Sequence, residues 1–429
     1  MKGIALEGGS SRGAYQMGVM KALYEKGYKF DVIAGTSIGA FNAAMIAQGD
    51  FEICYKLWEN MQPGTLFDIE NERMEKIADK GIDRETVVYL SSEAKKIIEN
   101  RGIGVEKLRK VIDEYIDEEK LRKSDIDFGL VTVKLDGIKP VPIEILKKDI
   151  PEGELKDYIM ASANLPFFKT EALDGNQYLD GGFYDKCPVQ LLERAGCNEI
   201  LAIRLTPDRK LKEPLKKSTK VKEIKSNESL GRGLIFTNHT LRDNISRGYF
   251  DMIREYEELK GRKYYIRPID DNEFLKRVME YPDYKMNELL KNINTTGMNN
   301  RRFIFEKIVP MICNILKIDE SASYQDIFII LLEELASERN IEQFRIYGLE
   351  EFVEKIRSIK SEKQTGVINN IKDAALNIIR PIEKFNRISL RGNIMKEFEK
   401  RVTMENQCRE GLLMPESSDC DKNKKKEKK

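Results

Sequence analysis

A serine between two glycines offers the clearest chemistry in this sequence. Gly35-Thr36-Ser37-Ile38-Gly39 has the pattern GxSxG, in which the glycines let the chain turn sharply and expose the serine hydroxyl. If the turn joins a strand to a helix, the hydroxyl lies near the positive end of that helix and can act as a nucleophile. A pattern this short also recurs by chance in ordinary tight turns. We predict that Ser37 is a nucleophile and that Gly35 and Gly39 shape its elbow.

A second glycine-rich segment lies near the start of the chain, at Gly8-Gly9-Ser10-Ser11-Arg12-Gly13. Backbone N–H groups that converge at a helix N-terminus bind anions, and in acyl transfer they stabilise the oxyanion. We therefore predict an oxyanion loop whose residues are Gly8, Gly9, Ser10, Arg12 and Gly13. A nucleotide-phosphate loop is disfavoured because Ala14-Tyr15 stand where a Walker A sequence has lysine and Ser/Thr. A purely structural glycine turn is the remaining alternative.

The third candidate is an aspartate that follows a short apolar run. Asp180-Gly181-Gly182 comes directly after Tyr178-Leu179. An aspartate released from a strand into a glycine turn can reach across the carboxyl edge of a sheet, where open α/β sheets bind ligands. Asp-Gly is also a common turn in which the aspartate bonds only to its own backbone. We predict that Asp180 is a base and that Gly181 and Gly182 form its turn.

The elements around these motifs indicate an α/β fold. Short apolar runs at Ile4–Leu6 and Phe30–Ala34 each precede a glycine loop, and helical spacing follows at 14–26 and 40–47. Strand–loop–helix units repeated in this way predict a mainly parallel sheet with helices on its faces. Further strand-like runs occur at 128–133, 141–145, 178–179 and 200–205, and we interpret the lysine-rich stretch 209–229 as an exposed loop.

The pattern changes to helices near residue 270. Phe328, Leu331, Leu332 and Leu335 fall at helical spacing, as do similar sets around 352–356 and 371–378. We predict a catalytic domain over 1–270, with Tyr264-Tyr265-Ile266 as its last strand, and a helical accessory domain over 271–412. The lysine-rich tail 413–429 has little to bury and is predicted to be disordered. The segment Gly64–Leu90 is a candidate flap above the sheet edge.

Composition excludes several classes of function. The 429 residues carry a formal net charge of +1, so no overall positive field indicates nucleic-acid binding. No apolar run is long enough to span a bilayer, and we expect no signal peptide. Six scattered cysteines indicate reduced thiols rather than a zinc site, and a single histidine rules out a histidine-rich metal site. We expect a cytoplasmic protein with peripheral contact to a membrane, with neither metal nor cofactor.

The single histidine, His239, leaves one rival mechanism open. The chain order Ser37, Asp180, His239 is that of the α/β-hydrolase triad. However, His239 leads into a predicted helix, and only one complete βα unit precedes the elbow, whereas an α/β-hydrolase normally has several strands before it. A Ser–Asp dyad, in which a buried carboxylate accepts the serine proton directly, is therefore preferred.

Taken together, the three motifs resemble the patatin-like phospholipases, with a helical C-terminal extension after a patatin domain of the bacterial type. The segment Met160-Ala161-Ser162-Ala163-Asn164-Leu165-Pro166 resembles the block upstream of that family's aspartate, and the match runs from residue 2 to about 205. The resemblance implies a three-layer α/β/α fold, a Ser37–Asp180 dyad and metal-free hydrolysis of acyl esters. Two departures stand out: Lys186 replaces the family's usual asparagine, and Ser10 replaces a third glycine.

The predicted function is therefore a lipid acyl hydrolase of the phospholipase A or esterase type, which takes its substrate from a membrane or micelle surface. A thioesterase or acyltransferase uses the same acyl-serine and stays open. The competing class is a non-catalytic lipid-binding scaffold on the same fold. The intact Ser37, Asp180 and glycine loop favour the enzyme, since a site without activity tends to lose a reacting group.

Overall fold

The computed structural model describes residues 1–62, 65, 105–136, 139–164, 172–173, 175–231, 237–280, 282, 284, 302, 304–319 and 321–359. The chain divides into two compact units, Met1–Glu258 and Leu259–Lys429, which are taken separately below. The domain boundary predicted near residue 270 falls inside the second unit, and the domain limits stay a prediction. The candidate flap, apart from Thr65, and the lysine-rich tail lie outside the described residues.

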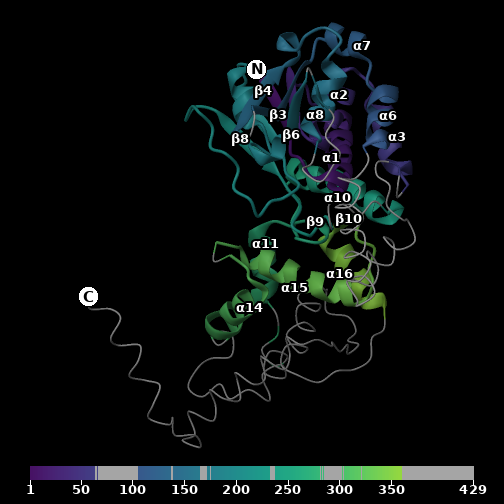
Figure 1. The fold of residues 1–429 in the computed structure, drawn as a ribbon. Coiled ribbons are helices and arrows are strands. Elements are labelled where there is room, and N and C mark those ends of the chain that lie inside the picture. Colours follow the sequence, from purple (N-terminus) through teal and green to yellow (C-terminus); the bar gives the residue numbers. More distant parts are fainter. Residues whose placement is uncertain are drawn as a thin grey trace, which may run out of the picture. The chain divides into compact units, whose positions relative to one another are not determined.

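A mainly parallel sheet forms the centre of the first unit (Figure 1). Its strands run in the order β5-β6-β3-β2-β1-β7-β8, and β4 also pairs with β3. β1, β2, β3, β7 and β8 pair in parallel, whereas β4 and β6 run antiparallel to β3. The predicted α/β class with a mainly parallel sheet is therefore confirmed. The strand bounds are β1 Lys2–Leu6, β2 Val32–Thr36, β3 Asp127–Asp136, β4 Lys139–Leu146, β5 Ala172–Leu173, β6 Asn176–Asp180, β7 Glu199–Ile203 and β8 Lys220–Ile224.

Helices cover both faces of this sheet, because alternate side chains of each buried strand point to opposite faces. On one face, Ala5, Val32 and Ala34 pack with α9 in a single apolar cluster. On the other face, α2 contacts β1, β2 and β3, and its neighbour α8 contacts β3 and β6, while α3 packs against α1 and α2 (Figure 1). The bounds of the helices in this unit are η1 Ser10–Gly13, α1 Ala14–Glu25, α2 Ile38–Ala47, α3 Phe51–Asn60, α6 Glu106–Tyr115, α7 Glu118–Lys123, η2 Lys147–Asp149, α8 Leu155–Ser162, η3 Gly181–Phe183, α9 Val189–Arg194 and α10 Asn238–Glu257.

Two strands meet end to end along one edge of β3, and this meeting positions the candidate site. Thr36, the last residue of β2, pairs with Val131 of β3. Asp180, the last residue of β6, pairs with Thr132, the next residue of β3. Because β2 runs parallel and β6 antiparallel to β3, their carboxyl ends face each other. The residue after Thr36, which is Ser37, therefore lies beside Asp180.

Two sequence-based assignments of strands are wrong. The stretch 209–229 is not all loop, because it contains β8, which pairs in parallel with β7. Lysines at exposed positions are typical of an edge strand, where they prevent pairing with other chains. Because of these lysines, the segment lacks the apolar run from which the other strands were predicted. Tyr264-Tyr265-Ile266 does not complete the central sheet, because β9 (Tyr265–Arg267) pairs with β10 (Ile346–Gly348) in a separate two-stranded sheet.

The second unit packs helices around this small sheet. Its helices are α11 Asp271–Met279, η4 Ile304–Ile308, α14 Val309–Leu316, α15 Tyr324–Glu338 and α16 Leu349–Ser358. α15 and α16 carry the first two predicted apolar sets, and these side chains are buried in one cluster with Tyr264 and Ile266. The carboxylate of Glu333 accepts the N–H groups of Arg262 and Tyr264, which fixes the turn into β9. The predicted set at 371–378 lies outside the described residues.

No helix within the described ranges is both long enough and apolar enough to cross a membrane.

Helices α1 and α10 cross in close contact, and glycines on both helices permit it. A Cβ atom at Gly18 would overlap the carbonyl oxygen of Ile245, and one at Gly248 would overlap that of Tyr15. Next to this crossing, the Tyr15 hydroxyl donates a hydrogen bond of 2.9 Å to the buried Asp251. The crossing therefore depends on glycine at both positions.

We expect Gly18→Ala to lower the stability of the first unit by about 3 kcal/mol, because the added methyl group forces two backbones apart. For a unit of this size that corresponds to a fall of roughly 6–12 °C in the melting temperature, measurable by calorimetry. Gly348→Ala is the matched control, since a Cβ atom there meets no heavy atom within 4 Å. An unchanged melting temperature for Gly18→Ala would show that the two helices are not in close contact.

Candidate active site

Ser37 stands in a strained turn between β2 and α2, as an elbow requires. Its φ of 58° and ψ of −128° are unusual for a residue with a side chain. Glycines make the turn feasible, since a Cβ atom at Gly35 would overlap the carbonyl oxygen of Gly39, and one at Gly39 would overlap that of Leu6. The predicted elbow residues are thus brought together around Ser37, at the N-terminus of a buried helix.

Ser162 holds the elbow from the neighbouring helix α8. The backbone N–H of Ser37 donates a hydrogen bond of 2.9 Å to Oγ of Ser162. The hydroxyl of Ser162 in turn donates to the carbonyl oxygen of Val131 at 2.7 Å. Ser162 is fully buried, so this bridge joins the strained turn to the centre of the sheet. The sequence singled out the block around Ser162, but nothing in it indicated this role.

Asp180 accepts a hydrogen bond from the Ser37 side chain. The same carboxylate accepts the N–H of Gly182 at 2.7 Å, which closes the predicted glycine turn. Gly181 has to be glycine, because a Cβ atom there would overlap the carbonyl oxygen of Val131 and lie 3.1 Å from Cγ2 of Thr36. The structure thus brings Ser37 and Asp180 into direct contact, as the motifs predicted. The meeting of the carboxyl ends of β2 and β6 explains this contact.

Burial raises the pKa of Asp180 from its usual 3.8 to about 6. The exposed fraction of Asp180 is only 4%, so its charge has lost most of its contact with water. Hydrogen bonds from Ser37 and Gly182 and the positive charge of Lys186 act in the opposite direction and lower the pKa. The net result is a carboxylate that is ionised at neutral pH and more basic than one in water.

The glycine loop lies against the same serine. A Cβ atom at Gly8 would come within 3.2 Å of Cβ of Ser37. The N–H of Gly8, however, donates to the carbonyl oxygen of Lys186 at 2.9 Å, so it is already used. Among the described residues, no hydrogen bond engages the N–H groups of Gly9 and Ser10, which open helix η1. Of the predicted oxyanion loop, these two groups are the donors left for a ligand.

The other two predicted loop residues anchor the loop. The side chain of Arg12 donates through Nε to the carbonyl oxygen of Gly231 at 2.9 Å. Gly13 gives room to Trp58, since a Cβ atom there would lie 2.9 Å from the indole ring. The carbonyl oxygen of Gly13 accepts a hydrogen bond from the buried Asn42, which also accepts one from Trp58. Arg12 and Gly13 thus act on the shape of the loop.

A buried ion pair supports the loop from the next strand, and the sequence analysis missed it. Glu7 and Arg204 are 1% and 2% exposed and lie 3.2 Å apart. Glu7 also accepts the N–H groups of Leu205 at 2.5 Å and Thr206 at 2.9 Å. These bonds fix the segment after β7 beside the glycine loop. A glutamate directly after the apolar run Ile4–Leu6, at the carboxyl end of a strand, was the available signal.

His239 does not join the site. It stands in the first turn of α10, its side chain is 86% exposed, and its Nδ1 lies 3.4 Å from the carboxylate of Asp243 in the same helix. Its partner is therefore a surface residue and not Asp180. This placement disfavours the Ser–His–Asp triad.

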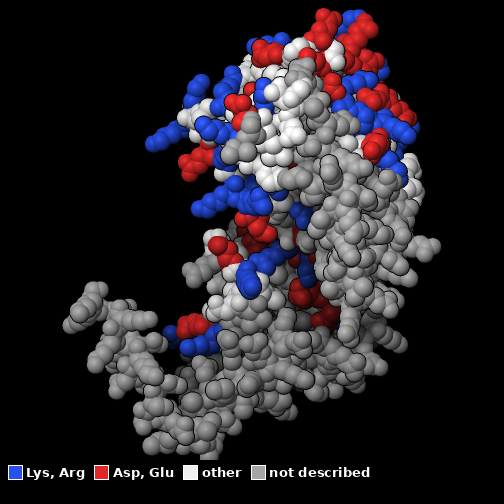
Figure 2. Space-filling model, in the orientation of Figure 1, with Lys and Arg blue, Asp and Glu red and all other residues white. Residues whose placement is uncertain are grey.

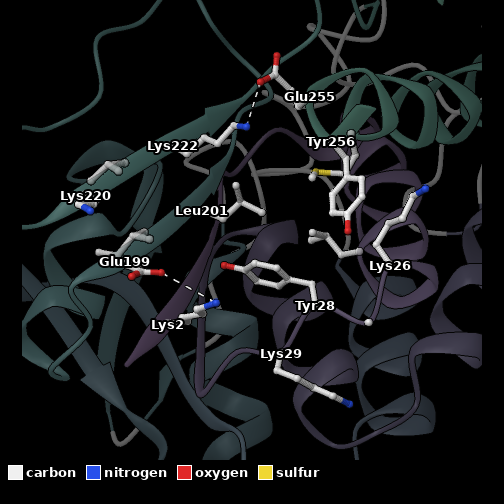
Figure 3. A pocket seen from close by; sticks show the side chains of 15 residues that line it. Lys2, Lys26, Tyr28, Lys29, Glu199, Leu201, Lys220, Lys222, Glu255 and Tyr256 are labelled. Carbon is white, nitrogen blue, oxygen red and sulfur yellow. Dashed lines mark ion pairs between the residues drawn. The ribbon is translucent and has the colours of Figure 1, made fainter. Parts of the chain in front are cut away.

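A hollow of about 780 Å³ lies at the opposite edge of the sheet (Figure 3). Three of its lining residues are the first residues of strands, namely Lys2 of β1, Glu199 of β7 and Lys220 of β8. Ion pairs join Lys2 to Glu199 and Lys222 to Glu255 on its rim. Since Ser37 follows the carboxyl end of β2, this hollow is not part of the candidate active site.

The fold and the site together define the class of protein. The family model described as "Patatin-like phospholipase" matches residues 4–192. This segment carries the glycine loop, the elbow and the aspartate turn described above. The chain therefore contains a patatin-like phospholipase domain, and the resemblance seen in its motifs is confirmed.

Curated relatives agree with this assignment. The chain is 26% identical over 212 residues to "Patatin-like phospholipase domain-containing protein 7" of Rattus norvegicus, which covers 47% of this chain and 13% of that protein. It is 56% identical over 46 residues to "Lysophospholipase nte1" of Aspergillus terreus, which covers 11% and 3% of the two chains. The chain thus spans only a small part of the length of these relatives.

Two solved structures share a distant likeness. VipD from Legionella pneumophila is 15% identical with a TM-score of 0.31, over 88% of this chain and 83% of that one. Full-length ExoU of Pseudomonas aeruginosa, solved in complex with SpcU, is 14% identical with a TM-score of 0.28, over 95% and 79%.

The raised pKa of Asp180 predicts that this residue lowers the stability of the folded protein at neutral pH. The unfolded chain releases this proton near pH 3.8 and the folded protein near pH 6, so the unfolded state binds fewer protons between these values. Folding stability attributable to Asp180 therefore falls as pH rises through this window and stays low above it. Asp180→Asn, which carries no charge, should be more stable than the wild type above pH 6, by up to about 3 kcal/mol.

Denaturant unfolding of both proteins at several pH values between about 4 and 8 measures this difference. Asp113→Asn is the matched control, because Asp113 is exposed and its substitution should give no such trend. A wild type that is as stable as Asp180→Asn at neutral pH would contradict the burial of an ionised carboxylate.

Proposed function

We propose that this protein is a lipid acyl hydrolase that cleaves carboxylic esters through a Ser37–Asp180 dyad. The observation that carries the proposal is the hydrogen bond between the Ser37 side chain and a buried carboxylate whose pKa is about 6. A nucleophile in contact with a base that is ionised at neutral pH is the minimum that acyl transfer requires. The match of residues 4–192 to the patatin-like phospholipases adds lipids as the substrate class.

In the first half of the proposed reaction, Asp180 accepts the Ser37 proton while Oγ forms a bond to the acyl carbon. The negative charge that develops on the carbonyl oxygen is stabilised by the N–H groups of Gly9 and Ser10. Such donors are typically worth about 10²–10³ in rate each. When the tetrahedral intermediate collapses, the ester C–O bond breaks, Asp180 returns the proton to the leaving alcohol, and an acyl-serine remains.

In the second half, Asp180 takes a proton from water as the water attacks the acyl-serine. The same oxyanion donors act again, the fatty acid leaves, and Ser37 regains its proton. Neither half requires a metal ion or a cofactor. His239, on the surface of α10, has no part in either step.

The pH dependence of ester hydrolysis tests the proposal. Because the reactive form of Asp180 is the ionised one, kcat/KM should fall as pH drops below about 6 and reach a plateau above it. Ser37→Ala and Asp180→Asn should each lower kcat by roughly a thousandfold or more, since the two groups act as a unit.

His239→Ala is the decisive control, because it removes the single histidine of the chain. The variant should keep its activity, and its kcat/KM should fall at the same acidic pH as that of the wild type. If His239→Ala abolished the activity or this fall in kcat/KM while the protein remained folded, the dyad would be wrong. Hydrolysis by Ser37→Ala at the wild-type rate would remove the proposal altogether.

A further inference from the structure

The hollow at the amino edge of the central sheet lies between strands and helices of the first unit (Figure 3). β1, β7 and β8 begin side by side there, because Lys2 pairs with Glu199 and Glu199 with Lys220 in the parallel register. The C-terminal ends of α1 and α10, two helices in close contact, line it from the other side. Its volume of about 780 Å³ lies within the range of sites for small organic molecules.

The floor of the hollow is apolar. Leu201 lies two residues after Glu199 on β7, so both side chains point to the same face of the sheet. Leu201, Leu23 of α1 and Met252 of α10 all line the hollow, and each is at most 6% exposed. An apolar group that entered the hollow would therefore rest on buried side chains and lose contact with water.

Two tyrosines add aromatic walls to this floor. Figure 3 shows Tyr28 and Tyr256 on one side of Leu201 and the lysines of β8 on the other. The ammonium group of Lys2 lies 5.2 Å from the ring centroid of Tyr28. That of Lys26 lies 4.9 Å from the ring centroid of Tyr256. These cation–π contacts place a positive charge beside each aromatic wall.

The rim of the hollow has more lysines than carboxylates. Five lysines and two glutamates line it, which leaves a formal charge of +3. Glu199 forms an ion pair with Lys2 at 4.0 Å. Glu255 forms one with Lys222 at 3.2 Å. Both glutamates are thus already paired. The charged residues of the lining are Lys2, Lys26, Lys29, Lys220, Lys222, Glu199 and Glu255.

Two of these lysines have no acidic partner of their own. Lys26 pairs at 2.9 Å with Glu257, which does not line the hollow. Within the part of the chain that the structure describes, no carboxylate forms an ion pair with Lys29 or Lys220. Both side chains are exposed at the rim. A ligand with a negative charge would supply the missing partner.

The surface next to the hollow has the same sign. Eight lysines and arginines but only two acidic residues lie between positions 209 and 225. β8 belongs to this segment, and Figure 2 shows basic side chains gathered on the visible face around it. This surface attracts anions toward β8 and therefore toward the hollow that β8 lines.

We propose that the hollow binds a long-chain carboxylate, with its apolar chain on the floor at Leu201 and its carboxylate at the rim near Lys220 and Lys29. The charge of the lining selects an anion, and the buried apolar floor selects an anion with an apolar body. Ammonium groups bind carboxylates through charge-assisted hydrogen bonds. Neither an inorganic anion nor a neutral amphiphile matches both features.

The inference goes beyond the proposed function and does not rest on it, because binding at this edge requires no turnover at Ser37. A fatty acid released by the proposed reaction has the required chemistry, as does any other acid with a long apolar chain. A bilayer surface is disfavoured as the occupant. Ser37 follows the carboxyl end of β2, so a membrane against the amino edge would lie at the end of the sheet away from the nucleophile.

Calorimetric titration of the full chain with decanoate, below the concentration at which decanoate aggregates, tests the site. Lys220→Glu and Lys29→Glu should each weaken binding about tenfold, because the reversal replaces an attraction by a repulsion. Raising the ionic strength from about 0.02 M to about 0.3 M should weaken binding by the wild type severalfold. Lys139→Glu is the matched control and should bind as the wild type does, since Lys139 is an exposed lysine of β4 that does not line the hollow.

Two further probes separate the charge of the ligand from its chain. Acetate has the same head group without the chain, and decyltrimethylammonium has the same chain with the opposite charge. Each should bind at least about tenfold more weakly than decanoate. Tyr256→Ala removes an exposed aromatic wall, so it should weaken the binding of decanoate and leave that of acetate unchanged.

Equal binding of decanoate by the wild type and by both lysine variants would overturn the proposal, because the acid would then occupy another place, such as the site at Ser37. Equal affinity for decyltrimethylammonium or for acetate would also overturn it. Should the protein hydrolyse no ester, the proposed function would fail, while the titration would still test the hollow. Both lysines are exposed, so either variant tests the proposal if the other does not fold.

Discussion

The hydrogen bond between Ser37 and Asp180 depends on where two strands end. β2 and β6 share one edge of β3 and approach each other from opposite directions, so their last residues pair with the adjacent Val131 and Thr132. The serine after β2 and the aspartate that ends β6 then have to meet. Gly181 makes the meeting sterically feasible, because any side chain there would overlap the backbone of β3. The chemistry of the site is thus a consequence of strand register.

This arrangement stores unfavourable free energy that the surrounding structure has to hold in place. Ser37 keeps a positive φ, and Asp180 keeps a charge with little access to water. Each feature costs on the order of 1–3 kcal/mol. The buried hydrogen bonds of Ser162 and the Glu7–Arg204 pair fix the backbone around these groups, so that the strained geometry is the one the fold permits. Strain held in place by buried polar networks is typical of sites in which reacting groups are preorganised.

The sequence predicted which side chains come together better than it predicted their surroundings. Ser37, the glycine loop and Asp180 lie in short motifs that can be recognised along the chain, although several of their glycines are required by contacts with distant segments, as Gly39 is by Leu6 and Gly181 by Val131. The end-to-end meeting of β2 and β6 depends on the pairing of both strands with β3, between Thr36 and Val131 and between Thr132 and Asp180, and no local pattern encodes such distant pairings. β8 was not predicted because its lysines interrupt the apolar pattern of a strand. β9 was assigned to the wrong sheet because the pattern of a strand does not show which strand it pairs with. Two further features could be found only in the structure. They are the hydrogen bond that already occupies the N–H of Gly8 and the support that Glu7 gives to the glycine loop.

The central claim is that Ser37 carries the acyl group during turnover, and acid-quenched peptide mapping tests it most directly. The protein is mixed with an activated short-chain ester, quenched within the first turnover, digested and analysed by mass spectrometry. We expect the acyl mass on the peptide that contains Ser37 in the wild type and in His239→Ala, and its near absence in Asp180→Asn. An acyl group on any other residue, or product release with no acyl group on Ser37 at any quench time, would contradict the account.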